Sequence, residues 1–180
     1  TTYRKMAADT VDAVQQHLGD RLASRTTHRC RTAQLQLRGA AGYEELRTNG
    51  AGPGEAGAGD ATVAHLADRY GGETHVLLTM VDTHPELGQP LVDGLPYLAA
   101  EAVYAARYEM AGTVDDVLSR RTRARLLARD ASGAAAPRVA ELIAPVLGLS
   151  PAEQAAQVDA YRDAIAGDTS WQPLAGSLDR

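Results

Sequence analysis

The sequence is poor in aromatic side chains and has almost no cysteine. Aromatic residues make up 4% of its 180 positions, and phenylalanine is absent altogether. A β-sandwich would use more aromatic and β-branched residues, so this composition, with its abundant alanine, favours closely packed helices. The single cysteine, Cys30, excludes a disulfide within the chain and is compatible with a reducing compartment.

Long hydrophobic runs and an excess of positive charge are missing as well. No apolar stretch approaches the roughly 20 residues that a membrane-spanning helix needs. The N-terminus has neither a signal-peptide pattern nor an initiator methionine, so we expect a cytoplasmic protein and a piece or processed product of a longer chain. A formal net charge of −5 argues against a surface built to bind nucleic acid.

Patterns for metal binding or catalysis are equally scarce. The five histidines show no metal-binding spacing, and His28 with Cys30 supplies only two of the three or four ligands that zinc requires. The glycine-rich stretch 50–59 is not followed by the lysine of a phosphate-binding loop. We therefore predict no metal site and no catalytic residue in this chain.

Helical signals, in contrast, run along most of the sequence. Apolar residues recur at three- and four-residue steps, and Pro96 holds a first-turn position for a long helix. Thr113 with Asp116 forms a variant capping box, and Ser150 with Glu153 forms a regular one. Pro145 predicts a kink or an early end. The predicted helices cover residues 2–18, 60–70, 73–82, 96–111, 113–129, 139–147 and 151–166.

These helices divide the chain into four parts. Residues 1–19 form one helix, and residues 20–59 form a connector whose glycine-rich portion cannot build a core. Residues 60–167 form a helical domain, and residues 168–180 form an irregular tail that Trp171 is expected to pin to the body. The predicted fold class is all-α: a small helical bundle-like domain preceded by one helix.

A run of five arginines lies between residues 120 and 129. It could form a phosphate or nucleic-acid patch, or it could pair with carboxylates within the domain. Glu101 lies among apolar neighbours and is hard to expose without exposing them. A buried carboxylate needs a partner, and arginine is the best one by geometry. We therefore predict structural ion pairs that involve Glu101, Arg121 and Arg123.

The order of residues is also similar to that of a known family. Residues 95–123, LPYLAAEAVYAARYEMAGTVDDVLSRRTR, resemble the C-terminal helical domain of FAD-dependent glycerol-3-phosphate dehydrogenases and alpha-glycerophosphate oxidases. There a proline-led helix rich in Ala, Glu and Tyr runs into a DVL-x-RRTR segment. TTYR at positions 1–4 resembles the end of the family's GGK-x-TTYR motif, which opens the last helix of the FAD-binding domain. The similarity covers roughly residues 1–35 and 60–165.

The resemblance implies an enzyme that oxidises sn-glycerol 3-phosphate to dihydroxyacetone phosphate with FAD and passes electrons to quinone or oxygen. Residues 1–19 would then be the last helix of the FAD-binding domain, with Thr1 and Thr2 at flavin-contacting positions. The catalytic groups would lie upstream, in the FAD and substrate domain that this chain caps. By itself the chain would bind no flavin and be inactive. The whole enzyme could sit peripherally on the cytoplasmic face of the membrane.

Two other classes remain open at this stage. In one, the chain is a small regulator that places residues 113–129 on DNA, although that segment lacks base-reading Asn or Gln. In the other, it is a stand-alone helical module that docks on a partner protein through an exposed apolar face.

Overall fold

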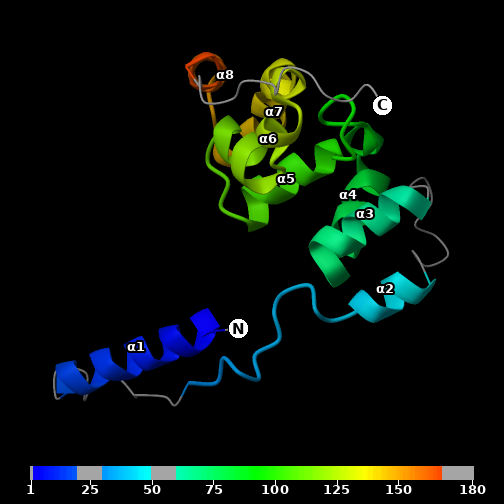
Figure 1. The fold of residues 1–180 in the computed structure, drawn as a ribbon. Helices are drawn as coiled ribbons and strands as arrows, with labels where there is room; N and C mark the ends of the chain where they lie inside the picture. Colours follow the sequence, from blue (N-terminus) through cyan, green and yellow to red (C-terminus); the bar gives the residue numbers. More distant parts are fainter. Residues whose placement is uncertain (1, 20–29, 50–59, 168–180) are drawn as a thin grey trace, which may run out of the picture.

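The computed structural model describes residues 2–19, 30–49 and 60–167, and within these ranges it contains helices and no strand (Figure 1). The all-α prediction is therefore confirmed. Thr1 and Trp171 lie outside the described residues. The α-helices are α1 Thr2–Leu18, α2 Tyr43–Asn49, α3 Asp60–Tyr70, α4 Thr74–Thr83, α5 Ala99–Tyr108, α6 Ala124–Leu127, α7 Arg129–Leu147 and α8 Pro151–Ala166. Two 3-10 helices, η2 Gly71–Glu73 and η3 Pro85–Gly88, and one π-helix, η4 Asp116–Arg121, lie between them.

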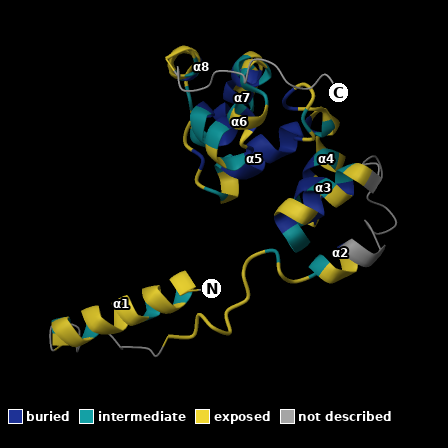
Figure 2. Ribbon diagram, viewed as in Figure 1, coloured by how far each residue is buried: buried dark blue, intermediate teal, exposed yellow. Residues whose placement is uncertain are grey.

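Helix α5 is the centre of the domain. Every residue from Ala99 to Ala105 is buried, and α5 is dark blue in Figure 2. Its alanines allow neighbouring helices to approach from both sides. Ala102 and Ala105 belong to one hydrophobic cluster, whereas Val103 and Tyr104 belong to another. A helix that is apolar all round is a core helix, and here it joins two half-cores into one body.

The two clusters are built from different helices. The larger one packs α7 against α8, α6 and η4, with Leu118, Ile143 and Tyr161 among its fully buried side chains. The smaller one packs α3 and α4 against the other side of α5 and includes Leu66 and Leu77. Because both clusters rest on α5, a shift of that helix would disturb both.

The connector contributes to this body. Residues 38–42 lie against the turn after α3, where the Gly72 N–H donates to the Gly39 carbonyl oxygen at 2.7 Å. A Cβ atom at Gly72 would lie 1.7 Å from the Ala41 carbonyl oxygen, so only glycine permits the approach. Helix α2 follows, packs on α3 and buries Leu46. Sequence patterns missed this contact, because close backbone approach leaves no mark except the glycines themselves.

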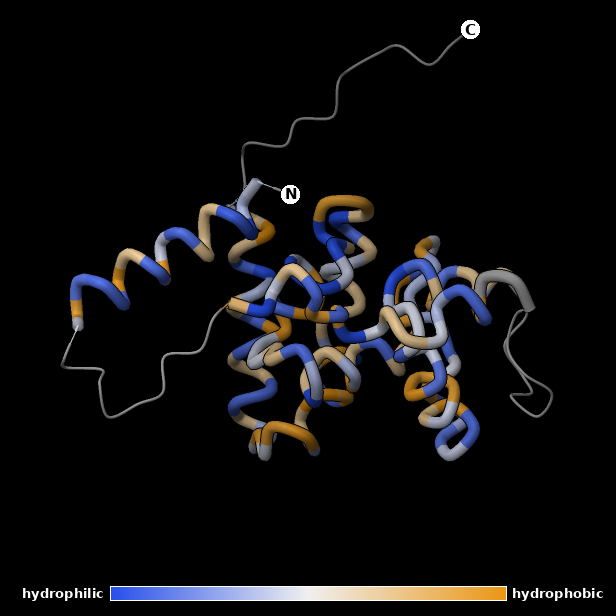
Figure 3. Tube along the Cα trace, turned by 90° about the horizontal axis from the view of Figure 1, so that it is seen from below, coloured by the Kyte–Doolittle hydropathy of each residue, from blue (hydrophilic) through white to orange (hydrophobic). Residues whose placement is uncertain are grey.

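Helix α1 stands away from the other helices (Figure 1) and buries none of its residues. Hydrophobic and hydrophilic residues alternate along it in Figure 3, as expected for an amphipathic helix. Its apolar side chains Tyr3, Met6, Val11 and Val14 are all exposed. The helix predicted for residues 2–18 is thus present, and none of the other described residues buries its apolar face.

Several boundaries differ from the sequence prediction. Helix α5 begins at Ala99 and not near Pro96, because the preceding residues form an antiparallel bridge between Pro90 and Leu98. Helix α7 begins at Arg129, ten residues before the predicted start, and continues through both Pro137 and Pro145. In contrast, the Ser150 box and the helix after it lie where predicted.

Candidate functional site

The most buried charge among the described residues is the carboxylate of Glu101, which is fully inaccessible. Its Oε1 accepts hydrogen bonds from the Leu98 N–H at 2.9 Å and from His65 Nε2 at 3.1 Å. Its Oε2 accepts from Arg69 Nε at 3.0 Å and from the Tyr70 hydroxyl at 2.9 Å. Glu101 therefore caps the start of α5 and ties it to three side chains of α3.

Arg69 carries this network further. Its guanidinium lies over the rings of Tyr70 and Tyr97, at 5.4 and 5.0 Å from their centroids. Its NH2 group donates to the Arg121 carbonyl oxygen at 2.7 Å. One arginine thus links α3, the loop before α5 and the end of the π-helix, and cation–π contacts hold its plane in place. The arginine beside Glu101 comes from α3 and not from the run, which corrects the partners predicted for Glu101.

Burial perturbs the tyrosines of this region. Burial, followed by the nearby charge of Glu101, raises the pKa of Tyr70 far above its usual value. Burial and a hydrogen bond to Glu73 raise the pKa of Tyr104 from 10.0 to about 12. Glu73 also accepts from Arg38 at 2.7 Å, and the Arg38 guanidinium lies 5.0 Å from the centroid of the Tyr108 ring. The Tyr70 and Tyr104 hydroxyls therefore stay protonated near pH 7 and donate to Glu101 and Glu73.

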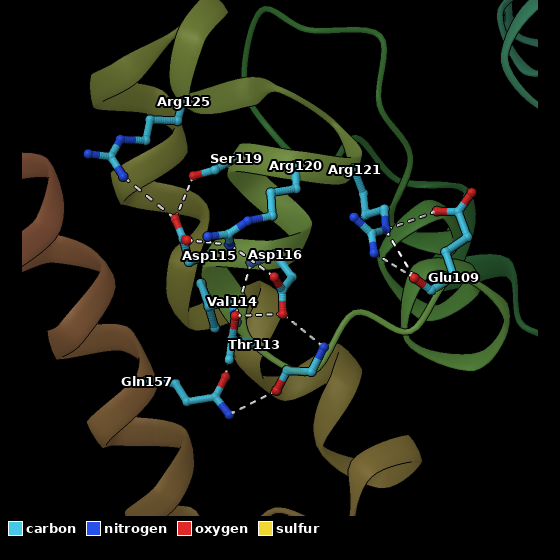
Figure 4. Close-up of polar contacts among 11 residues, drawn as sticks. Glu109, Thr113, Val114, Asp115, Asp116, Ser119, Arg120, Arg121, Arg125 and Gln157 are labelled. Carbon is cyan, nitrogen blue, oxygen red and sulfur yellow. Dashed lines mark hydrogen bonds and ion pairs between the residues drawn. The ribbon is translucent and has the colours of Figure 1, made fainter. Parts of the chain in front are cut away.

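The first residue of the arginine run pairs with acidic neighbours on the same turn (Figure 4). Arg120 NH1 lies 2.6 Å from Asp115 and 2.9 Å from Asp116, and Ser119 also donates to Asp115. Burial alone would raise the pKa of Asp116, but hydrogen bonds from Thr113 and Gly112 outweigh it and lower that pKa. These contacts stabilise the start of η4, and the two carboxylates neutralise the charge of Arg120.

Three further arginines of the run bind the carboxyl ends of helices. Arg121 donates through Nε and NH2 to the Glu109 carbonyl oxygen, at 3.1 and 2.6 Å, and so caps the end of α5. Its Nε also lies 3.9 Å from the Glu109 carboxylate. Arg125 donates to the Ala164 carbonyl at 2.9 Å, and Arg129 donates to that of Ile165. Cations belong at helix C-termini, so the run holds α5 and α8 in place.

Arg123 behaves differently from its neighbours. It is exposed, has a left-handed backbone with φ of 59°, and precedes α6. No ion pair of Arg123 is found among residues 2–19, 30–49 and 60–167, in contrast to the prediction. The backbone turns at this point because the π-helix ends here, where Thr122 N–H and Oγ1 both donate to the Val117 carbonyl. Sequence spacing predicted a continuous helix, and a π-helix followed by a break is not visible in that spacing.

The Thr113–Asp116 box forms as a cap with altered geometry. The Asp116 N–H donates to Thr113 Oγ1 at 3.0 Å, and the Asp116 carboxylate reaches the Gly112 N–H at 3.0 Å. Gln157 of α8 bridges the same loop, accepting from Val114 N–H at 3.0 Å and donating to the Gly112 carbonyl at 3.4 Å (Figure 4). Helix α8 is therefore attached at both its middle and its end.

Neither a metal-binding cluster nor a membrane-spanning helix is found in the part of the chain that the structure describes. No three histidine, cysteine, aspartate or glutamate side chains gather closely enough there to hold a metal ion. None of the described helices combines the length and the hydropathy required to cross a bilayer. Thr2 lies exposed at the start of α1, and α1 stands away from α3 and α5 in Figure 1.

These contacts define a structural helical domain. Its buried charged side chains are hydrogen-bonded to other residues of the domain and hold its helices together. Comparison with known proteins also identifies the chain as a domain of a larger protein. The chain belongs to the family described as the C-terminal domain of alpha-glycerophosphate oxidase, whose model matches residues 30–154. No solved structure matches it.

Curated relatives extend the similarity over most of the chain. It is 37% identical over 162 residues to glycerol-3-phosphate dehydrogenase 2 of Mycobacterium tuberculosis, which covers 89% of this chain and 27% of that protein. It is 36% identical over 169 residues to a probable mitochondrial glycerol-3-phosphate dehydrogenase of Caenorhabditis elegans, covering 92% and 23%. A mitochondrial glycerol-3-phosphate dehydrogenase of Arabidopsis thaliana is 34% identical over 157 residues, covering 80% and 24%. The chain thus spans about a quarter of the length of these relatives.

Proposed function

We propose that this chain works as the C-terminal helical domain of an FAD-dependent glycerol-3-phosphate dehydrogenase. In this proposal the whole protein oxidises sn-glycerol 3-phosphate to dihydroxyacetone phosphate, and the present domain caps its FAD and substrate domain without supplying catalytic groups. The observation that carries the proposal is the coverage: the match extends over 89% of this chain but only 27% of the relative. The fold fits that role, since the buried acids and most of the arginine run are bound internally.

In this proposal the residues of the present chain do not hold FAD by themselves. The start of α1 offers unpaired backbone N–H groups, which suit negative charge, but α1 buries none of its residues and forms no enclosure with the described helices. We propose that Thr1 and Thr2 border the flavin only when the preceding domain is attached. Peripheral membrane binding and transfer of electrons to quinone or oxygen belong to the proposed whole enzyme.

The test compares the whole gene product with this chain alone. We expect the whole protein to purify with the absorbance of bound flavin and to reduce a dye when glycerol 3-phosphate is added. Residues 1–180 alone should show neither property. A whole protein without flavin, or one inert toward glycerol 3-phosphate, would contradict the proposal.

A DNA-binding function is disfavoured by the same contacts. A recognition helix needs free arginines, whereas Arg120, Arg121 and Arg125 bind carboxylates and helix ends within the domain. The segment that would enter the groove is a π-helix followed by a break at Arg123, and not one continuous helix.

A further inference from the structure

A groove of about 460 Å³ lies between α4 and α5, on the side of the domain where the connector arrives. Val76 and Met80 of α4 contribute apolar surface to it. Thr79 and Thr83 line it too, and their hydroxyls donate to carbonyls of their own helix, so they add little free polarity. The groove is suited to apolar side chains.

The rim of the groove carries the fixed positive charge of Arg107, and His84 on the same rim lies 3.4 Å from the Glu86 carboxylate. Arg107 lines it with two histidines, His75 and His84, and no aspartate or glutamate belongs to the lining formed by the described residues. Arg107 is exposed, and among residues 2–19, 30–49 and 60–167 it has no ion pair. Charge complementarity therefore favours an occupant that brings a carboxylate together with apolar side chains.

The groove continues into the place where the connector meets the body. Tyr108 lines the groove and also receives the Arg38 guanidinium on its ring, at 5.0 Å from the centroid. Exposed apolar residues gather in sequence around both partners: Leu35 and Leu37 precede Arg38, and Met110, which is 91% exposed, follows Tyr108. Helix α8 differs, because its described residues expose no large hydrophobic side chain.

We infer that the α4–α5 groove is the face on which the N-terminal part of the same protein docks, through a segment that presents apolar side chains and a carboxylate to Arg107. The inference rests on the proposed function. The relatives are much longer than this chain, and the family that matches is a C-terminal domain, so a large partner precedes the domain in them. In this chain Arg38 of the connector lies on the ring of Tyr108, which lines the groove. Helix α8 then faces solvent.

Cysteine labelling in the whole protein tests the docking face. Thr79→Cys places a thiol in the groove, and Ala156→Cys places one on the exposed surface of α8. Each is introduced with Cys30→Ser, and labelling by a maleimide is followed at the individual peptide by mass spectrometry. We expect the thiol at position 79 to react at least about tenfold more slowly than the one at position 156 in the folded protein, and both to react alike after unfolding.

A charge reversal checks the predicted chemistry. Arg107→Glu should speed labelling at position 79 in the whole protein, because the acidic segment is repelled. Arg162→Glu, an equal charge change on α8, should leave it unchanged. Equal effects of the two variants would overturn the role of Arg107.

Two outcomes separate the docking face from the proposed function. If flavin and glycerol 3-phosphate oxidation are present but position 79 labels as fast as position 156, the groove is not the interface and only this inference fails. Protection at Leu126→Cys on α6, without protection at position 79, would move the interface to another face and overturn it as well. Absence of flavin and activity would contradict the proposed function itself.

Discussion

At the scale of single residues, the buried carboxylate of Glu101 organises the contact between α3 and α5. Glu101→Gln keeps the shape but removes the charge that faces Arg69, and an amide cannot accept from all four donors. Breaking a buried pair in this way costs about 3 kcal/mol. Urea unfolding of residues 1–180 should therefore show a clearly lower unfolding free energy.

Glu141→Gln is the matched control for this substitution. Glu141 is exposed on α7 and pairs with Arg138 three residues away, at 3.2 Å. Exposed pairs contribute little, so its loss should hardly change the unfolding free energy. Equal losses of unfolding free energy at the two positions would show that burial does not strengthen the contacts of the Glu101 carboxylate.

A second residue-scale prediction concerns Tyr104 and alkaline pH. Its pKa is raised from 10.0 to about 12 in the folded chain, first by burial and then by its bond to Glu73. The folded state thus keeps the proton longer than the unfolded state. The contribution of Tyr104 to stability is therefore complete below pH 10 and is lost as the pH rises toward 12.

Tyr104→Phe should make that loss shallower, as measured by urea unfolding at a series of alkaline pH values. Tyr70 and Tyr161, whose pKa values burial also raises, would contribute to what remains. Tyr3→Phe alters a tyrosine that is 79% exposed and should leave the profile unchanged. An identical slope in wild type and Tyr104→Phe would show that the phenol does not titrate as described.

Sequence reasoning reached part of this residue-scale picture. The apolar neighbours of Glu101 predicted its burial and its need for an arginine, and both are present. Its partner Arg69 lies 32 residues upstream on another helix, a distance that no local spacing can bridge. The arginines between residues 120 and 129 bind main-chain carbonyl oxygens as well as carboxylates. Because every residue has a main-chain carbonyl, such partners cannot be recognised in the sequence.

At the scale of elements, backbone packing of glycines fixes the connector to α3. Gly72→Ala would place a methyl group 1.7 Å from the Ala41 carbonyl oxygen and force the two segments apart. Such overpacking costs about 1–3 kcal/mol. Hydrogen exchange of this variant should show faster exchange of the amides at position 72 and at Leu46. Gly112→Ala, whose added carbon would meet only Asp116 at 3.9 Å, should leave both rates unchanged.

Helix ends marked by their own side chains were predicted well. Ser150 and Glu153 form the expected reciprocal bonds. The Glu153 N–H donates to Ser150 Oγ at 3.3 Å, and the Ser150 N–H donates to Glu153 Oε2 at 2.8 Å. Ends set by distant contacts were not. The start of α5 depends on the bridge between Pro90 and Leu98, and the end of η4 depends on Thr122, whose side chain is buried by the surrounding helices.

At the scale of the whole molecule, α5 joins the two hydrophobic clusters, whereas α1 buries none of its residues against the rest of the described chain. Most helix stability in proteins comes from packing of an apolar face, so α1 should be marginal in residues 1–180 alone. We expect its amides to exchange quickly while those of α5 are strongly protected. In the whole protein the amides of α1 should become protected as well. Strong protection of α1 in the short chain would contradict this account.

The bonds from Arg125 and Arg129 to the last turn of α8 have a consequence for how this domain can vary. Because the acceptors are main-chain oxygens, Ala164 and Ile165 can be exchanged for other residues without loss of those bonds. Inserting or deleting one residue within α8 cannot be tolerated in the same way, since it would rotate the last turn by about 100° and carry the oxygens out of reach. Helix length, more than residue identity, is the property that divergent versions of this domain have to preserve.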